Sequence, residues 1–173
     1  MNARREDLIS AASDGHARVT TVIVTYNSAG TIGATLEALE STASSGFNRC
    51  VVVDNDSADN TASLIEQDFP WVTVVRSREN LGFARGCNLG FEKANTPYVL
   101  FLNPDAVLSA SGLHTLFEFM EDNTDVAVTA PATRVGDSGY QKVGMLTTPG
   151  QLLRSALGLP DAYPDSAPIA FGE

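Results

Sequence analysis

The sequence predicts an α/β fold in which helices cover both faces of a mostly parallel β-sheet. Short runs rich in β-branched residues alternate along the chain with segments whose apolar residues recur at helical spacing. The predicted strands are apolar almost without interruption, as expected of parallel strands buried on both faces. With 173 residues, the chain has the length of one such domain with a core of its own.

The first half of the chain supplies two predicted strands and two predicted helices. Residues 19–26, VTTVIVTY, are rich in β-branched side chains and predict a buried strand. Residues 29–42 carry apolar side chains at helical spacing and predict a helix. Residues 50–55, CVVVDN, predict a second buried strand, and residues 59–69 predict a helix with Asp59 as its N-cap.

The second half continues the alternation and ends in less regular sequence. Residues 71–77, WVTVVRS, alternate as a strand does, and residues 82–94 predict a helix despite their glycines. Residues 98–103, YVLFLN, predict the fourth strand and residues 111–123 the next helix. Residues 125–131, DVAVTAP, predict a fifth strand.

The predicted helix 82–94 has two further features. Its helical spacing places three apolar side chains on one face, those of Phe83, Cys87 and Phe91. Its glycines can allow close packing of the helix on the sheet, a role that leaves open whether they also serve a site. These glycines are Gly82, Gly86 and Gly90.

Charge limits the partners of this protein. The formal net charge is −10, which makes nonspecific nucleic-acid binding a poor candidate, because that activity needs a basic face. The repulsion between this net charge and a bound anion such as a diphosphate would have to be offset locally, by a divalent cation or by clustered arginines. Arg76, Arg78 and Arg85 form the one candidate cluster near the predicted sheet, although Arg76 and Arg78 fit ordinary surface charge as well.

Localisation is predicted from what the sequence lacks. Its apolar runs are too short for a transmembrane helix, so no membrane span is expected. Residues 1–17 are polar and have no apolar segment of the kind found in secretory signals, so we expect a flexible leader. The cytoplasm is therefore the expected compartment, and attachment to a membrane surface through partners stays open.

Several common sites are excluded by their missing motifs. The turn after the first strand is Tyr-Asn-Ser-Ala-Gly, which does not match the Gly-x-Gly-x-x-Gly turn of dinucleotide-binding enzymes. No Gly-Lys-Ser/Thr of a phosphate-binding loop occurs, and no Gly-x-Ser-x-Gly elbow is present. Dehydrogenase, nucleoside triphosphatase and serine hydrolase activities are not expected.

Polar residues follow each of the first four predicted strands, and parallel strands share one carboxyl edge. Asp54 ends the second strand, where a carboxylate can accept hydrogen bonds from a base or a ribose. Asp105 follows the fourth strand, where a carboxylate can hold Mg²⁺ or Mn²⁺ next to a diphosphate. Both also fit simple turns, and Arg85 fits a surface helix position. Helix capping alone accounts well for Asp56, Ser57 and Asp59.

Four segments, in this order and at this spacing, carry a resemblance to a known family. They are VTTVIVTYNSAGTIGATLEALE, VVVDNDSADNT, NLGFARGCNLGFEKA and YVLFLNPDA. Residues 18–135 resemble family 2 glycosyltransferases with the Rossmann-like GT-A fold, and most of all the rhamnosyltransferase-like branch. The resemblance implies transfer of a sugar, with inversion, from a UDP- or dTDP-linked donor to an acceptor hydroxyl in cell-wall or polysaccharide biosynthesis.

For the nucleoside side of the donor, the resemblance assigns residues from the first two segments. Thr25, Tyr26 and Asn27 would line the nucleotide pocket, partly through backbone groups. Asp54 would contact the base or the ribose.

For the diphosphate side, the resemblance assigns residues from the last two segments. Asn80, Arg85 and Asn88 would close over the nucleoside and the diphosphate. Asn103 and Asp105 match the Asp-x-Asp motif of the family, with Asp105 as the ligand of Mg²⁺ or Mn²⁺. The first position of that motif is Asn here, so it brings no charge to the metal.

The family continues past these segments with an acceptor-binding half that carries the general base, and the sequence contains no match to that half. We expect residues 18–133 to form the donor-binding domain, and 134–173 to begin the acceptor side and end in a Pro-rich tail. The protein would then be a short form of the enzyme, or would borrow its acceptor half from a second protomer or a partner chain. The alternative is a non-catalytic nucleotide-sugar-binding or regulatory module.

Overall fold

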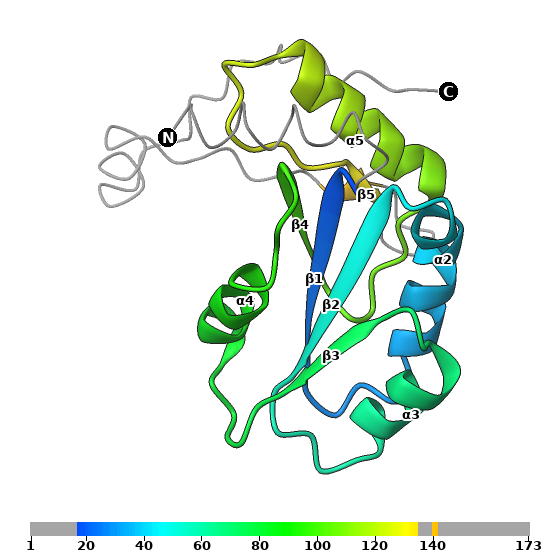
Figure 1. Ribbon diagram of the computed structural model, residues 1–173, viewed down its shortest axis with the longest axis vertical. Helices are drawn as coiled ribbons and strands as arrows, with labels where there is room; N and C mark the ends of the chain where they lie inside the picture. Colours follow the sequence, from blue (N-terminus) through cyan, green and yellow to red (C-terminus); the bar gives the residue numbers. More distant parts are fainter. Residues whose placement is uncertain (1–16, 135–139, 142–173) are drawn as a thin grey trace. The chain divides into compact units, whose positions relative to one another are not determined.

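The computed structural model describes residues 17–134 and 140–141 of the chain (Figure 1). The chain divides into two compact units, one that ends at Phe117 and one that begins at Glu118. The first unit contains the parallel sheet and the helices that cover it.

The sheet consists of four parallel strands in the order β3-β2-β1-β4. They are β1 (Val19–Thr25), β2 (Asn48–Asp54), β3 (Thr73–Arg76) and β4 (Tyr98–Leu102). Every residue of β1 is buried, which explains why this strand is apolar or β-branched throughout. The predicted α/β domain with a mostly parallel sheet is confirmed, and the reversal of strand order lies between β1 and β4.

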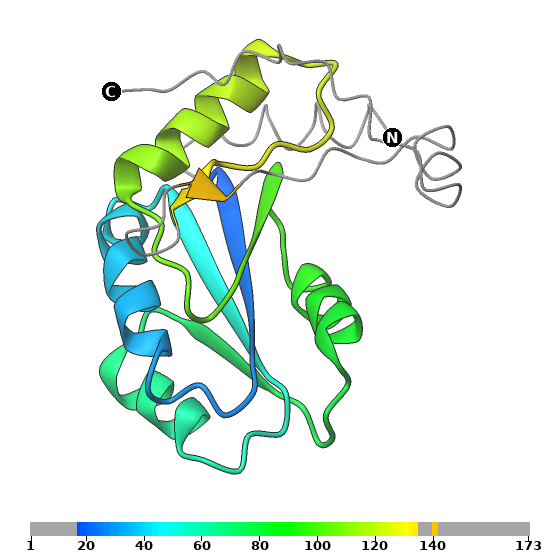
Figure 2. The same ribbon diagram turned by 180° about the vertical axis from the view of Figure 1, so that it is seen from behind.

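Helices cover both faces of this sheet, as predicted. The described helices are α2 (Ile32–Ser44), α3 (Thr61–Asp68), α4 (Phe83–Phe91) and α5 (Ala110–Asp122). In Figures 1 and 2, α2 and α3 lie on one face of the sheet and α4 lies on the other. Among the described residues, no helix is both long enough and apolar enough to cross a membrane.

The main apolar core lies between the sheet and α2 with α3. Ile23 of β1 and Val52 of β2 pack there against Leu36 of α2 and Ile65 of α3, and all four side chains are fully buried. Burial of each such side chain contributes about 1.5–3 kcal/mol to folding. The core therefore holds β1 and β2 rigidly up to their carboxyl ends.

On the opposite face, α4 packs closely against β1 and β2. A Cβ atom added at Gly86 would meet the side chain of Val24, and one added at Gly90 would meet those of Val22 and Val53. These two glycines therefore let the helix backbone approach the valines of the sheet. The structure thus shows the close-packing role for Gly86 and for Gly90.

The apolar face of α4 is not the face that packs on the sheet. Phe83 and Phe91 are 59% and 56% exposed, and the buried residues of this helix are Gly86 and Gly90. Apolar side chains at helical spacing suggested a core face, but close contact with the sheet favours the face that has no side chains.

The predicted fifth strand, at residues 125–131, is also absent. No residue of this segment is in a strand, and Val128 is 84% exposed. The described strands of the second unit are β5 (Thr133–Arg134) and β6 (Tyr140–Gln141), which pair antiparallel. Local alternation predicts a strand only where a neighbouring strand is available for hydrogen bonding.

Candidate functional site

The loops that follow β1, β2 and β3 gather at the carboxyl edge of the sheet, at the lower end of Figure 1. A pocket of about 330 Å³ lies there. It is lined by Val24, Thr25, Tyr26, Ser28, Asn55, Asn80, Gly82, Phe83 and Pro104. The pocket is therefore bounded by the ends of β1 and β4, between which the strand order reverses.

Three residues predicted for the site lie in the pocket wall: Thr25, Tyr26 and Asn80. The other six are not among the lining residues: Asn27, Asp54, Arg85, Asn88, Asn103 and Asp105. Four further lining residues are not predicted from the sequence: Ser28, Asn55, Phe83 and Pro104. Three of these belong to the polar segments that follow strands, a signal that could have identified them.

Asp54, at the end of β2, is only 5% exposed and is not among the residues that line the pocket. Its Oδ1 accepts a hydrogen bond of 3.4 Å from the Thr25 hydroxyl, and its Oδ2 accepts one of 3.4 Å from the backbone N–H of Ser57. Both bonds are long, so the carboxylate keeps capacity for stronger partners. Asp54 is positioned by β1 and by the loop that follows β2.

Asn27 connects the loop after β1 to the loop after β2. Its backbone has a positive φ of 52°, which asparagine tolerates better than most residues. Its N–H donates to the Ser57 hydroxyl at 2.9 Å, and its Oδ1 accepts from the N–H groups of Ala58 at 2.8 Å and Asp59 at 3.3 Å. The side-chain oxygen of Asn27 is thus engaged within the protein.

Asp59 reinforces the same connection from the other side. Its carboxylate accepts hydrogen bonds from the backbone N–H of Ala29 at 3.2 Å and from that of Thr61 at 3.0 Å, as well as from the Thr61 hydroxyl. The N-cap of α3 is Asn60, so the prediction of Asp59 at that position was wrong by one residue. The hydrogen bond from the Thr61 hydroxyl is the main cause that lowers the pKa of Asp59.

This pKa shift predicts a pH dependence of stability. Because the folded-state pKa of Asp59 lies below its ordinary value of 3.8, its contribution is present above that value and is lost as the pH falls through the folded-state pKa. Asp59→Asn should therefore lower Tm at neutral pH, and the difference from the wild type should shrink below about pH 4. Tm measured across pH tests this, with Asp68→Asn as control. A difference that is constant down to acid pH would contradict it.

Asn55 and Asn80 form a pair of amides in the pocket wall. Asn55 is 3% exposed, and its Nδ2 donates to the Oδ1 of Asn80 at 2.8 Å. The backbone N–H of Leu81 donates to Asn55 Oδ1 at 2.8 Å, and that of Gly82 donates to Asn80 Oδ1 at 2.9 Å. Gly82 has a positive φ of 74°, a conformation that favours glycine. The pair fixes the backbone turn that leads into α4.

The arginines near the pocket differ in how many of their side-chain nitrogens already have hydrogen-bond partners. Arg76 donates from Nε and Nη2 to the two carboxylate oxygens of Glu66, at 3.1 and 2.8 Å. Arg85 donates from Nε to the backbone oxygen of Leu81 at 2.8 Å, and its terminal nitrogens have no partner among the described residues. Arg85 is therefore better placed than Arg76 to meet an anion. Asn88 is exposed on α4, one turn further along the helix.

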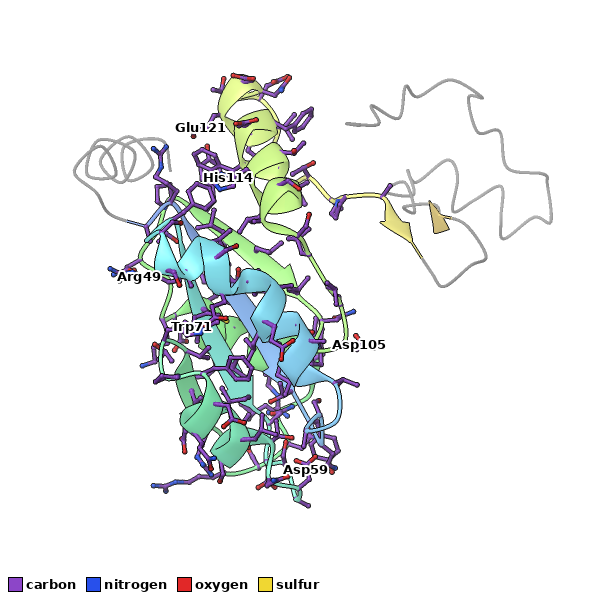
Figure 3. All side chains as sticks on the ribbon, turned by 90° about the vertical axis from the view of Figure 1, so that its right-hand side faces the viewer. Arg49, Asp59, Trp71, Asp105, His114 and Glu121 are labelled. Carbon is purple, nitrogen blue, oxygen red and sulfur yellow. The ribbon has the colours of Figure 1, made fainter. Side chains whose placement is uncertain are left out.

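The segment Asn103-Pro104-Asp105 forms a turn at the end of β4. The N–H of Ala106 donates to the backbone oxygen of Asn103 at 3.2 Å, which closes the turn around Pro104. The Thr35 hydroxyl donates to the backbone oxygen of Pro104 at 2.9 Å and ties the turn to α2. In Figure 3, Asp105 accordingly lies beside α2. Pro104 lines the pocket, while Asn103 and Asp105 are exposed on either side of it.

The predicted metal ligand fits a cation that is held jointly with a bound phosphate. The carboxylate of Asp105 has no hydrogen-bond partner among the described residues. Within residues 17–134 and 140–141, no group of three or more His, Cys, Asp or Glu side chains could hold a metal by itself. Mg²⁺ and similar cations are commonly bound by one or two carboxylates together with substrate phosphates, an arrangement that Asp105 allows.

Solved structures show the same fold. The mannosyltransferase PcManGT from Pyrobaculum calidifontis, in complex with GDP-Man and Mn²⁺, matches with a TM-score of 0.56 at 22% identity, over 70% of this chain and 44% of its own. Residues 1–349 of S. aureus TarS, in complex with UDP-GlcNAc, match with a TM-score of 0.53 at 25% identity, over 62% of this chain and 32% of that one.

Curated relatives and a family model match as well. An uncharacterized glycosyltransferase of Haemophilus influenzae is 28% identical over 105 residues, which are 61% of this chain and 35% of that protein. A teichoic acid poly(glycerol phosphate) polymerase of Staphylococcus epidermidis is 27% identical over 62% of this chain and 15% of its own length. The chain thus spans about a third or less of these relatives. Because the model of the glycosyl transferase family 2 matches residues 20–169, most of the sequence, the chain belongs to that family.

Proposed function

We propose that the protein binds a nucleotide-diphosphate sugar in this pocket, together with a divalent cation, for inverting transfer of the sugar to an acceptor hydroxyl. One observation carries the proposal: all four segments that resemble the family contribute to the same pocket. Tyr26 comes from the first segment, Asn55 from the second, Phe83 from the third and Pro104 from the fourth.

The nucleoside would occupy the part of the pocket near β1 and the start of α4. Tyr26 and Phe83 line it and are 52% and 59% exposed, so their ring faces are available for stacking with a base. Asp54, which hydrogen-bonds to the pocket-lining residue Thr25, would accept hydrogen bonds from the base or the ribose. Thr25 and Asn27 would act mainly through the loop geometry that they maintain.

The diphosphate would extend towards α4 and the turn after β4. The protein carries a net charge of −10, so a bound diphosphate needs local positive charge and hydrogen-bond donors. Arg85 would supply the charge from α4, and Asn80 and Asn88 would contribute polar contacts.

A divalent cation would complete the charge balance at the turn after β4. Asp105 would bind it directly, and Asn103 would bond a ribose hydroxyl or a water. The cation would neutralise the leaving diphosphate as the glycosidic bond breaks. We assign no general base: Asp54 serves the nucleoside and Asp105 the cation in this proposal. The proposal includes a base supplied by a second protomer or a partner chain.

The relatives support the donor class. S. aureus TarS is known in complex with UDP and with UDP-GlcNAc, and PcManGT with GDP-Man and Mn²⁺. The relative from S. epidermidis is a teichoic acid polymerase, which supports a role in cell-wall or polysaccharide biosynthesis. A rhamnosyl donor, the preference for UDP or dTDP and a cytoplasmic location, with or without attachment to a membrane surface, stay predictions from the sequence.

Calorimetric titration of the protein with UDP, dTDP and GDP tests the proposal. We expect at least one of them to bind, and we expect Mn²⁺ or Mg²⁺ to tighten the binding, because Asp105 alone completes only part of a cation's coordination shell. Adenosine diphosphate serves as a control for nonspecific affinity. Failure of all three nucleotides to bind, with and without the cation, would overturn the donor site.

A further inference from the structure

The two amides in the pocket wall have orientations that the backbone determines. An asparagine side chain can present either its oxygen or its nitrogen in a given direction. The N–H of Leu81 can bond only to an acceptor, so it requires the oxygen of Asn55 at that position. The N–H of Gly82 likewise requires the oxygen of Asn80. Each amide is thus oriented by a backbone donor that cannot itself be reversed.

The contact between the two side chains agrees with this orientation. With its oxygen on Leu81, Asn55 turns its Nδ2 towards Asn80, and it donates to the oxygen of Asn80 at 2.8 Å. Asn80 Oδ1 therefore accepts two hydrogen bonds, one from Asn55 and one from Gly82. A reversed Asn80 would place its N–H groups against both of these donors.

The nitrogen of Asn80 is consequently left for the pocket. Its Nδ2 has no partner among the described residues, and Asn80 is exposed and lines the pocket. Two hydroxyls of the pocket wall are already used as donors inside the protein: that of Thr25 is shared between Val53 O at 3.3 Å and Asp54 Oδ1 at 3.4 Å, and that of Ser28 donates to Tyr26 O at 3.3 Å.

We propose that Asn80 donates a hydrogen bond from Nδ2 to an acceptor oxygen of the bound nucleotide, and that Asn55 is the positioning residue that holds its amide in this orientation. The acceptor is a carbonyl oxygen of the base or an oxygen of the phosphates. This inference rests on the proposed function, since it needs a nucleotide in the pocket. It goes beyond it in giving the polarity of one contact and the residue that sets it.

Asn80→Asp separates this role from a structural one. The new carboxylate can still accept from Asn55 Nδ2 and from Gly82 N–H, so both internal hydrogen bonds survive and Tm should not fall. Only the outward N–H₂ group is lost. We expect Kd for the nucleotide that the wild type binds to rise about tenfold or more, the cost of a lost hydrogen bond facing an unsatisfied acceptor. Unchanged affinity would overturn the proposal.

Two controls exclude a simple effect of charge. Asn95→Asp makes the same chemical change at an exposed residue before β4, at the amino end of the sheet, and should leave Kd unchanged. Titration in about 1 M salt, where the Debye length is about 3 Å, screens repulsion through space but does not restore a missing donor. A loss of affinity that disappears in high salt would therefore also overturn the proposal.

Comparison of ligands locates the acceptor oxygen. Uridine, UMP and UDP, or the corresponding series for another base, are titrated into the wild type and Asn80→Asp. Equal ratios of Kd across the series place the acceptor on the nucleoside, and a loss confined to UMP and UDP places it on a phosphate. If the wild type binds none of these ligands, the proposed function fails, and this inference fails with it. If the wild type binds and the variant binds equally, only the inference fails.

Asn55→Asp tests the positioning role. The new carboxylate still accepts from Leu81 N–H but places an oxygen where the N–H faced Asn80, so the Asn80 amide should rotate and turn its oxygen to the pocket. NMR of side-chain amides gives the readout, with the Asn80 signals identified by their absence in Asn80→Asp. In the wild type they should shift when nucleotide is added, and in Asn55→Asp this shift should be lost together with affinity. If the Asn80 side-chain signals of the wild type do not shift when nucleotide is added, the proposal is overturned.

Discussion

Gly90→Ala should destabilise the protein by about 1–2 kcal/mol, because the cost of about 2–3 kcal/mol for a methyl group forced into a packed core is only partly offset. A Cβ atom at Gly90 would overlap Cγ1 of Val22 and would lie 3.2 Å from Cγ2 of Val53. Both valines belong to the buried central strands, so neither can move away freely. Helix propensity favours alanine over glycine by about 1 kcal/mol, which offsets only part of the overlap. Equilibrium unfolding in urea measures the change.

A matched substitution on the other face of the sheet provides the control. Gly33 lies in α2, and a Cβ atom there would meet nothing within 4 Å. Gly33→Ala should therefore stabilise the protein by about 0.5–1 kcal/mol through helix propensity alone. Val22→Ala removes the methyl groups that the new side chain would meet, so the double variant with Gly90→Ala should be more stable than additivity predicts. Equal stability of the two glycine variants would contradict the close packing of α4.

The contrast between these glycines shows which features of the fold the sequence can reveal. Continuous apolar runs identified β1, β2 and β4, and the alternation of elements predicted a parallel sheet with both faces covered. The face of α4 could not be obtained in this way. Phe83 and Phe91 have the spacing of a core stripe, yet the buried positions are Gly86 and Gly90. Hydrophobic periodicity assumes that side chains make the contact, and in α4 the backbone does.

The location of the site could be predicted from the sequence better than the residues that face the pocket. Parallel strands bring their carboxyl ends to one edge, and this rule correctly gathered the loops around Tyr26 and Pro104. The same rule could not distinguish residues that face the pocket from residues that hydrogen-bond to a neighbouring loop. Asn27 and Asn80 are the same residue type in loops of the same edge, but Asn27 bonds to the loop after β2 and Asn80 lines the pocket. That difference depends on backbone N–H directions, which composition and spacing do not encode.

Asp105→Ala should abolish the tightening of nucleotide-diphosphate binding by Mn²⁺ or Mg²⁺. In the proposed site Asp105 is the only carboxylate assigned to the cation, and a cation held by one protein carboxylate and the phosphates loses its anchor when that carboxylate is removed. Kd for the diphosphate with the cation should then equal Kd without it. Asp68→Ala, at an exposed carboxylate at the end of α3, should leave the effect of the cation intact. Calorimetry with and without the cation measures both.

The same variant tests how the two carboxylates divide their roles. Asp54 is buried beside Thr25 and is assigned to the nucleoside, whereas Asp105 is exposed on the turn after β4. Asp105→Ala should therefore leave affinity for the nucleoside without phosphates nearly unchanged. Because Asp105 makes no hydrogen bond to any described residue, its removal should not alter the fold, and Tm should stay close to that of the wild type. A parallel loss of nucleoside and diphosphate affinity would mean that Asp105 shapes the pocket as a whole, and the assignment of a cation to this turn would fail.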